Sequence, residues 1–377
     1  MDLIEGQATP EGTRGYQVRH PQVREAHGYR KSGDLQVSSI GLGTYLGEVS
    51  PERDEGYKAA IVAALSGGIN VVDTAINYRH QRSERVIHEA LREFFEADED
   101  PEGRREEVFV ATKGGYLPLD GDVEDPHKKV QEDYVESGLV TPETLMVDAH
   151  CMEPAYLEDQ IGRSRRNLGL ETIDLYYVHN PETQLAQVAP QVFEKRLGQA
   201  FLALEKNVAA GRIGHYGVAT WAGLRAPLDH KAHLSLERML AAAQDATREA
   251  GHEQHHFAAV QAPLNLGMPE AVTEATQRVG DETMPLCRAV QHLGLSWFTS
   301  ASLMQGKLAE GIPFRLQSMI GAVGDAAQTA LQATRSAPGV TSALVGMSSR
   351  RHVESALGLL RSSPPGASGV WPDQNSA

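Results

Sequence analysis

Residues 71–80 read VVDTAINYRH, an apolar run that ends in an acid and is followed, after a short turn-like segment, by a phenol. Seven further short runs of apolar or β-branched residues occur along the chain. With NVVDTA (70–75) they are SIGLGTY (39–45), VFVATK (108–113), IDLYYVH (173–179), HYGVAT (215–220), FAAVQAP (257–263), LSWFTSA (295–301) and TSALVG (341–346). Most lack a polar alternation, which is typical of parallel strands that are covered on both faces.

Amphipathic helical patterns lie between these runs, and several of them end in glycine, as helices often do. Examples are YKAAIVAALSGG, RVIHEALREFF, LEDQIGRSRRNLG, FLALEKNVAAG and RRHVESALGLL. Eight strand-then-helix units predict an α/β fold, a single (β/α)8 TIM barrel with long rim loops, with a doubly wound open sheet as the alternative. In either fold the carboxyl ends of the strands form the functional rim.

The predicted barrel spans residues 36–362, between an N-terminal extension (1–35) and a C-terminal tail (363–377). Residues 114–152 form a long segment between one strand and its helix. Loops of that length in a compact domain are usually functional or disordered. Because this one leaves the carboxyl end of a strand, we expect it to cover a substrate.

Composition excludes several classes of protein. The net charge of −15 and the pI near 5.5 oppose binding to nucleic acid or to an anionic membrane. No apolar stretch is long enough to span a membrane, and no signal peptide is recognisable, so we expect a cytoplasmic protein. Cys151 and Cys287 are too few for a disulfide framework or a cysteine-based zinc site, and no metal site is predicted.

Polar residues close three of the predicted strands. Asp73, Lys113 and His179 would reach one rim, with Tyr78 in the loop just beyond. Each alone has an ordinary structural reading, such as a helix cap, a solvated charge or a core histidine. Together they suit proton delivery to a carbonyl: a tyrosine needs a neighbouring cation to lower its pKa, a buried ammonium needs a counter-ion, and a histidine can donate to a substrate oxygen.

The chain resembles the aldo-keto reductase superfamily over roughly residues 36–360. The motifs that carry the resemblance are VVDTAINY, VATKGGY, DLYYVHNPE, GRIGHYGVATW and SAPGVTSALVGMSSRRHVESAL. The family implies a barrel that binds NADPH and reduces an aldehyde or ketone. Carried over by position, Tyr78 would be the general acid, Lys113 and Asp73 the pair that lowers its pKa, and His179 the group that orients the carbonyl.

The implied cofactor positions match the family less well. Gln261 matches the glutamine that holds the nicotinamide carboxamide, but the usual Ser-Asn partners are Ala219 and Thr220. The aromatic residue that stacks on the nicotinamide is replaced by Ser300, in the motif that ends at Leu303.

At the adenine end of the implied cofactor site, the family's Arg, Asn and Lys positions are occupied by His352, Ala356 and Gly346. Arg350 and Arg351, with Ser348 and Ser349, are near enough in sequence to meet a 2′-phosphate at a helix N-terminus. The alternative is that both arginines are solvated surface charges.

Two motifs are set aside. GLGTYLG (41–47) has its third glycine misplaced for a dinucleotide fingerprint and lacks the later acidic partner, so it fits a tight strand end. HEQHH (252–256) fits the His-Glu-x-x-His pattern in letters, but that pattern requires one continuous helix, and Gly251 is expected to end the helix just before it.

The predicted function is NADPH-dependent reduction of a small carbonyl substrate, with NADH possible. Two alternatives stay open: non-redox acid–base chemistry on a sugar-like substrate, such as dehydration, elimination or epimerisation, and a regulatory binding module. Tyr45, His150, Trp221 and Phe314 are candidates for the substrate pocket.

Overall fold

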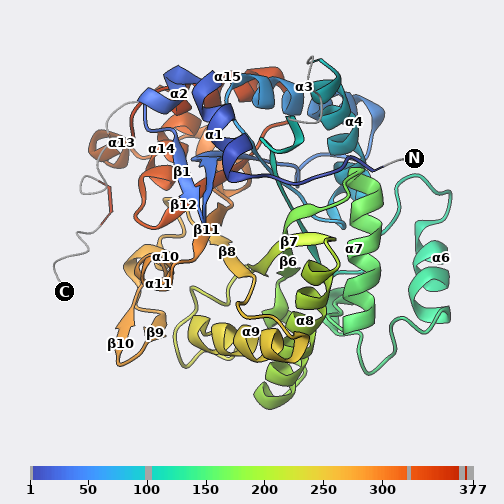
Figure 1. The fold of residues 1–377 in the computed structure, drawn as a ribbon. Helices are drawn as coiled ribbons and strands as arrows, with labels where there is room; N and C mark the ends of the chain where they lie inside the picture. Colours follow the sequence, from blue (N-terminus) through green and yellow to red (C-terminus); the bar gives the residue numbers. More distant parts are fainter. Residues whose placement is uncertain (1–2, 98–103, 321–323, 365–369, 372–377) are drawn as a thin grey trace.

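The computed structural model describes residues 3–97, 104–320, 324–364 and 370–371, and its centre is a closed barrel of parallel strands (Figure 1). The strand order around the barrel is β11-β12-β3-β4-β5-β6-β7-β8, which confirms the (β/α)8 barrel and excludes the open sheet. The strands are β3 (Ile40–Gly43), β4 (Val71–Asp73), β5 (Phe109–Gly114), β6 (Ile173–His179), β7 (Ile213–Ala219), β8 (Phe257–Pro263), β11 (Ser296–Ser300) and β12 (Val340–Gly346).

Helices surround the barrel (Figure 1). Apolar residues of these helices are buried in one cluster with residues of the strands. The longer ones are α3 (Pro51–Gly67), α4 (Arg82–Glu96), α7 (Pro154–Leu168), α8 (Pro190–Ala209), α9 (Leu236–Ala250), α11 (Leu286–His292), α14 (Ala326–Ser336) and α15 (Arg350–Leu360). Helix α3 shows how the sequence sets the boundaries: the Ser50 hydroxyl accepts from the Arg53 amide at its start, and Gly68 ends it with φ of 119°.

The segment before the barrel is structured and closes its amino-terminal end. It consists of α1 (Pro10–Arg19), α2 (Pro21–Glu25) and a hairpin of β1 (Tyr29–Ser32) with β2 (Leu35–Ser38). Val37 of β2 packs in one buried cluster with Val71 and Phe109, the first residues of β4 and β5. The hairpin therefore plugs the barrel on the face opposite the functional rim.

Shorter elements build the rim and the loops. They are η1 (Tyr78–Gln81), α6 (Pro126–Val130), η2 (Gln131–Glu136), η3 (Val147–Ala149), η4 (Pro181–Ala186), α10 (Glu270–Thr273), the hairpin of β9 (Gln277–Val279) and β10 (Glu282–Met284), η5 (Met304–Gly306), α12 (Lys307–Glu310) and α13 (Phe314–Ile320). No helix among the described residues is both long and apolar enough to cross a membrane.

The 114–152 segment is fastened to α4 at its start. Arg85 forms a two-pronged ion pair with Asp120, at 2.8 and 2.9 Å, and Arg82 contacts Asp122 at 2.8 Å. At the other end of the chain, residues 365–369 and 372–377 lie outside the described residues. Trp371 is 5% exposed, and its indole nitrogen donates to the Ala333 carbonyl of α14 at 2.9 Å.

Candidate active site

A buried ion pair lies at the carboxyl ends of β4 and β5. The Lys113 ammonium is fully buried and donates to the Asp73 carboxylate at 2.6 Å and to the Thr74 carbonyl at 2.7 Å. The other Asp73 oxygen accepts from the amide of Gln261 at 2.8 Å. Burial lowers the pKa of Lys113 and raises the pKa of Asp73, and in each case the charge of the partner opposes the shift.

Tyr78 follows β4 and lies beside this pair. The Lys113 ammonium is 5.0 Å from the centre of the Tyr78 ring. Burial raises the pKa of Tyr78 well above its ordinary value, and the Asp73 carboxylate raises it further because it disfavours a neighbouring phenolate. The Lys113 ammonium is directed to Asp73 and Thr74, and the net direction of the Tyr78 pKa is upward, so the lowering of this pKa by Lys113 stays a prediction.

The backbone that carries Tyr78 turns in an unusual way. Arg79, His80 and Gln81 follow it with φ of 47°, 55° and 69°, three successive residues in the left-handed region. The turn is held by the Arg79 guanidinium, which is buried, bonds to the Glu48 carbonyl at 2.9 Å and to Asp54 at 2.6 Å. Such strain is found where the surrounding structure fixes a residue in place, here directly after Tyr78.

His179 ends β6 with its ring edge-on to Tyr78, at a centroid distance of 5.9 Å. Burial and the nearby Lys113 charge lower the pKa of His179 well below its usual range, so the imidazole is neutral. Its Nδ1 is buried and has no hydrogen-bond partner among the described residues. The residue as a whole is partly exposed and lines the cavity described below, so its ring can meet an incoming group.

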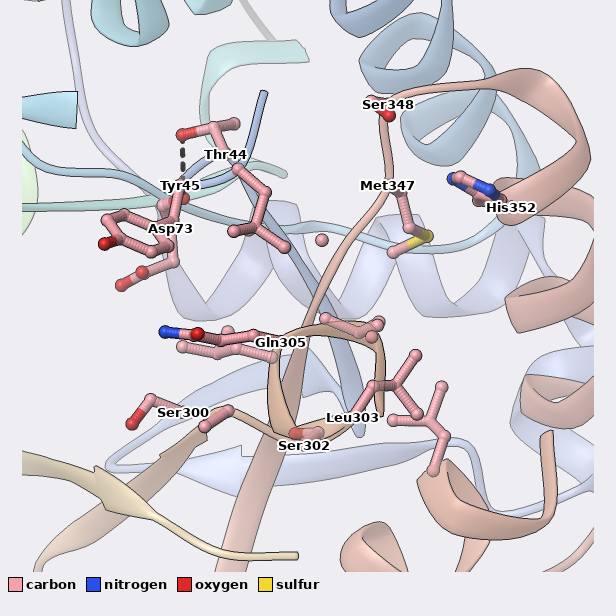
Figure 2. Close-up of a pocket in the computed structure, with 18 of the residues that line it drawn as sticks. Thr44, Tyr45, Asp73, Ser300, Ser302, Leu303, Gln305, Met347, Ser348 and His352 are labelled. Atoms are coloured by element: carbon pink, nitrogen blue, oxygen red, sulfur yellow. Dashed lines mark hydrogen bonds between the residues drawn. The ribbon is translucent and has the colours of Figure 1, made fainter. Parts of the chain in front are cut away.

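A cavity of about 960 Å³ opens at this rim and runs along the carboxyl ends of the strands to the start of α15. Asp73, Tyr78 and His179 line one end of it, and Lys113 lies behind Asp73. Figure 2 shows Tyr45 and Asp73 on one side and Met347, Ser348 and His352 on the other, with Gln305, Ser300, Ser302 and Leu303 below them. The cavity is long enough to join two separate groups of side chains.

The residues predicted to meet a nicotinamide all line this cavity, and they are Ala219, Thr220, Gln261, Ser300 and Leu303. The Thr220 hydroxyl is buried and lacks a hydrogen-bond partner within the described part of the chain. Neither Trp297 nor Phe298, the aromatic residues just before Ser300, replaces the missing aromatic stack. Trp297 packs in the outer core, and Phe298 stacks on Phe109 inside the barrel, so neither lines the cavity.

The far end of the cavity is built by β12 and the first turns of α15. Gly346, Ser348 and Arg351 line it, whereas Arg350 does not. Ser349 caps α15 by accepting from the His352 amide. Arg53 of α3, which the sequence did not single out, reaches this end and donates to the Ser348 hydroxyl at 3.1 Å. A single arginine at the helix start, Arg351, therefore faces the cavity, with Arg53 beside it.

Of the four residues proposed for the substrate pocket, Tyr45 and Trp221 line the cavity and are 53% and 45% exposed. His150 does not line it: the side chain is fully buried behind His179 and contacts the His179 carbonyl at 2.7 Å. Phe314 is 83% exposed and also lies outside the lining.

Tyr116 was missed by sequence reasoning. It lines the cavity, its ring lies edge-on to His179 at 5.1 Å, and its hydroxyl accepts from Asn180 at 3.1 Å. The only available signal was its place three residues after Lys113, where any residue could have stood. The Gly-rich stretch 41–47 forms the end of β3, as expected, and α9 ends at Ala250 with Gly251 in the left-handed region, so HEQHH is a connector.

The Aldo/keto reductase family model matches residues 39–310 of the chain. The chain is 29% identical over 194 residues to an aldo-keto reductase, yakc [NADP(+)], of Schizosaccharomyces pombe, which covers 50% of this chain and 44% of that protein. It is 29% identical over 167 residues to a D-threo-aldose 1-dehydrogenase of a Pseudomonas species, covering 44% of each. The aligned part of the chain thus spans less than half the length of either relative.

Solved structures agree on the fold. An aldo-keto reductase from Klebsiella pneumoniae in complex with NADPH superposes with a TM-score of 0.57 at 21% identity, over 89% of this chain and 90% of that one. An aldo-keto reductase from Bacillus halodurans in its holo form gives a TM-score of 0.61 at 18% identity, over 90% and 93%. The family model covers most of the barrel, and the chain therefore belongs to the aldo/keto reductase family.

Proposed function

We propose that the protein is an NADPH-dependent oxidoreductase that reduces an aldehyde or ketone to an alcohol, with Tyr78 as the general acid. The observation that carries the proposal is the cavity itself. It joins a protonated phenol, a neutral imidazole and a buried ion pair at one end to a helix N-terminus with an arginine at the other.

The residues along the cavity fit a dinucleotide. The Thr220 hydroxyl has no hydrogen-bond partner among the described residues and is a candidate partner for the nicotinamide carboxamide. The side-chain amide of Gln261 is nearby and donates to Asp73. The first backbone amides of α15, together with Arg351, suit a phosphate, which is the reason to expect NADPH ahead of NADH. When bound there, the reduced nicotinamide supplies a hydride to the carbonyl carbon.

The chain's own residues then have separate tasks. His179, neutral at physiological pH, donates an N–H to the carbonyl oxygen and so directs it toward Tyr78. Tyr78 gives its phenolic proton to the same oxygen as negative charge develops there. The phenolate that results lies 5.0 Å, measured from its ring centre, from the Lys113 ammonium, which stabilises the charge until solvent returns the proton.

The decisive experiment combines cofactor binding with one substitution. NADPH and NADH are titrated by fluorescence or calorimetry, and turnover is measured with a panel of aldehydes and ketones for the wild-type protein and for Tyr78→Phe. We expect NADPH to bind both proteins equally and turnover of Tyr78→Phe to fall by at least about 10². A variant that reduces its best substrate at the wild-type rate would remove Tyr78 from the role of acid.

A second function is favoured by one observation: Ser300 stands where the aromatic stack is expected, and Ala219 and Thr220 stand where the usual amide-holding pair is expected. Loss of the stack and of two hydrogen bonds is expected to weaken cofactor binding by about 1.5–4.5 kcal/mol in total. If neither cofactor binds at millimolar concentration while a hydroxy-carbonyl or sugar substrate is still transformed, the same residues serve non-redox acid–base chemistry instead.

A further inference from the structure

Glu205 is a fully buried carboxylate near the end of α8, beside the residue that precedes β8 and far along the strands from the catalytic rim. One of its oxygens, Oε1, accepts from the Tyr216 hydroxyl, the Thr247 hydroxyl and the His256 backbone amide, each at 2.9 Å. These three contacts hold the carboxylate in one orientation. They leave the second oxygen, Oε2, to other partners.

Two imidazoles converge on that second oxygen. The Nδ1 atoms of His252 and His256 lie 3.1 and 2.7 Å from Oε2 of Glu205. The three atoms all lie within 4.8 Å of one another. Both histidines come from the connector between α9 and β8 and are the first and last residues of HEQHH, whereas Glu205 stands 47 positions before His252 and lies outside that motif.

The Glu205 carboxylate faces more hydrogen-bond donors than it has lone-pair sites to accept them. A carboxylate offers about four lone-pair sites, and this one faces five donors if both imidazoles carry a proton on Nδ1. A single cation in place of the two Nδ1 protons would satisfy Oε2 and both neutral rings at once. The contacts to Oε1 would then be the outer hydrogen bonds that orient a ligating carboxylate.

We propose that Glu205, His252 and His256 bind a divalent ion of the zinc class. Two imidazoles and one carboxylate form a set that zinc accepts, with water completing the tetrahedron. Bonds of about 2.0–2.2 Å place tetrahedral ligands roughly 3.4 Å apart, so the three atoms need only small movements to reach that spacing. The side chains of His252 and His256 are 20% and 32% exposed, which gives an ion a path from solvent.

The site is structural, because it ties α8 to the connector that leads into β8. The three residues lie at the amino-terminal side of the strands, where side chains of such barrels usually serve stability. The cavity lies at the opposite, carboxyl ends of the strands. The ion therefore raises stability and leaves NADPH binding unchanged. This inference does not depend on the proposed reductase activity.

The test uses the full chain without a histidine tag, freed of metal by a chelating resin and titrated with Zn²⁺ by calorimetry. We expect one Zn²⁺ per chain and a melting temperature that rises with Zn²⁺ concentration. His252→Gln and His256→Gln should each weaken Zn²⁺ binding at least about tenfold. The matched control is His292→Gln, which alters an exposed histidine at the end of α11 and should bind as the wild-type protein does.

Absence of Zn²⁺ binding to the wild-type protein would overturn the proposal, and so would affinities of the His252 and His256 variants equal to that of the His292 control. If either variant fails to fold, Co²⁺ titration of the wild-type protein decides. The visible absorption of tetrahedral Co²⁺ supports the site, and a spectrum identical to free Co²⁺ rejects it.

Discussion

Tyr78 differs from a simple activated tyrosine because its surroundings favour the protonated phenol. Burial and the Asp73 carboxylate raise its pKa well above the ordinary value near 10. A general acid acts in its protonated form, so its activity is lost only as the pH rises through that raised pKa. We expect kcat/KM for carbonyl reduction to stay level up to about pH 10. A loss with a midpoint near pH 8 that disappears in Tyr78→Phe would contradict this.

Asp73 should contribute to the stability of the fold as well as to the proposed chemistry. It is the counter-ion of an ammonium with no exposed surface. Asp73→Asn leaves that charge buried without compensation, and we expect the free energy of unfolding to fall by about 3–5 kcal/mol. Urea denaturation measures the change, with the exposed Asp229→Asn as control. An unchanged unfolding midpoint would mean that water reaches Lys113 through the cavity.

At the scale of elements, the start of the 114–152 segment depends on Arg85. The hydrogen bond from Arg85 lowers the pKa of Asp120. A carboxyl whose folded pKa lies below its unfolded value stabilises the fold above the unfolded value and loses that contribution as the pH falls through the folded one. Arg85→Gln should therefore cost about 1 kcal/mol at neutral pH and little below about pH 3.

Hydrogen exchange of the amides in residues 114–125 measures this effect. The control is Arg92→Gln on the same helix, since the partner of Arg92 is Glu96 of α4 itself. Equal exchange in the two variants would show that the segment is held by other contacts.

Strand boundaries were the most predictable elements. The predicted limits of β6 and β8 equal the observed ones, although Asp174 and Gln261 interrupt these mostly apolar runs. In a mostly apolar strand, the sequence does not show which residues face the barrel interior and which face the helices. Successive side chains point to opposite sides, and residues on both sides are apolar. Trp297, for example, packs outward and Phe298 packs inward. The β1–β2 hairpin was missed because each strand has four residues, and Val37 is buried only by capping the barrel.

At the scale of the whole molecule, the proton-delivery residues were predictable and their pairings were not. Lys113 meets Asp73 as expected from adjacent strands. The bond from Gln261 to Asp73 joins residues 188 positions apart in the chain, and only the closed barrel brings them together. Sequence reasoning that treats each strand end by itself has no signal for such a contact.

Val370 and Trp371, the described residues near the C-terminus, pack against the main hydrophobic core. Trp371 is buried against α14, a helix whose Gln328 and Leu331 line the far end of the cavity. We expect Trp371→Ala to lower the free energy of unfolding by about 3 kcal/mol, measured by thermal or chemical denaturation. Trp221→Ala, at an exposed rim position, should change it by less than about 1 kcal/mol. Similar values for the two variants would show that Trp371 is not packed against α14 in solution.

The hydrogen bond between Gln261 and Asp73 links two halves of the barrel that have different proposed roles. Strands β4 and β8 stand on opposite sides of the ring, four places apart in its order. The proposed acid, its ion pair and the histidine all come from β4–β6, whereas the proposed cofactor contacts come from β7, β8, β11 and β12. Residues in the half that is proposed to bind the cofactor, such as Ser300, can therefore be substituted without changing the residues proposed for proton transfer. Gln261 is the exception, because a substitution there would remove a contact to Asp73 in the other half.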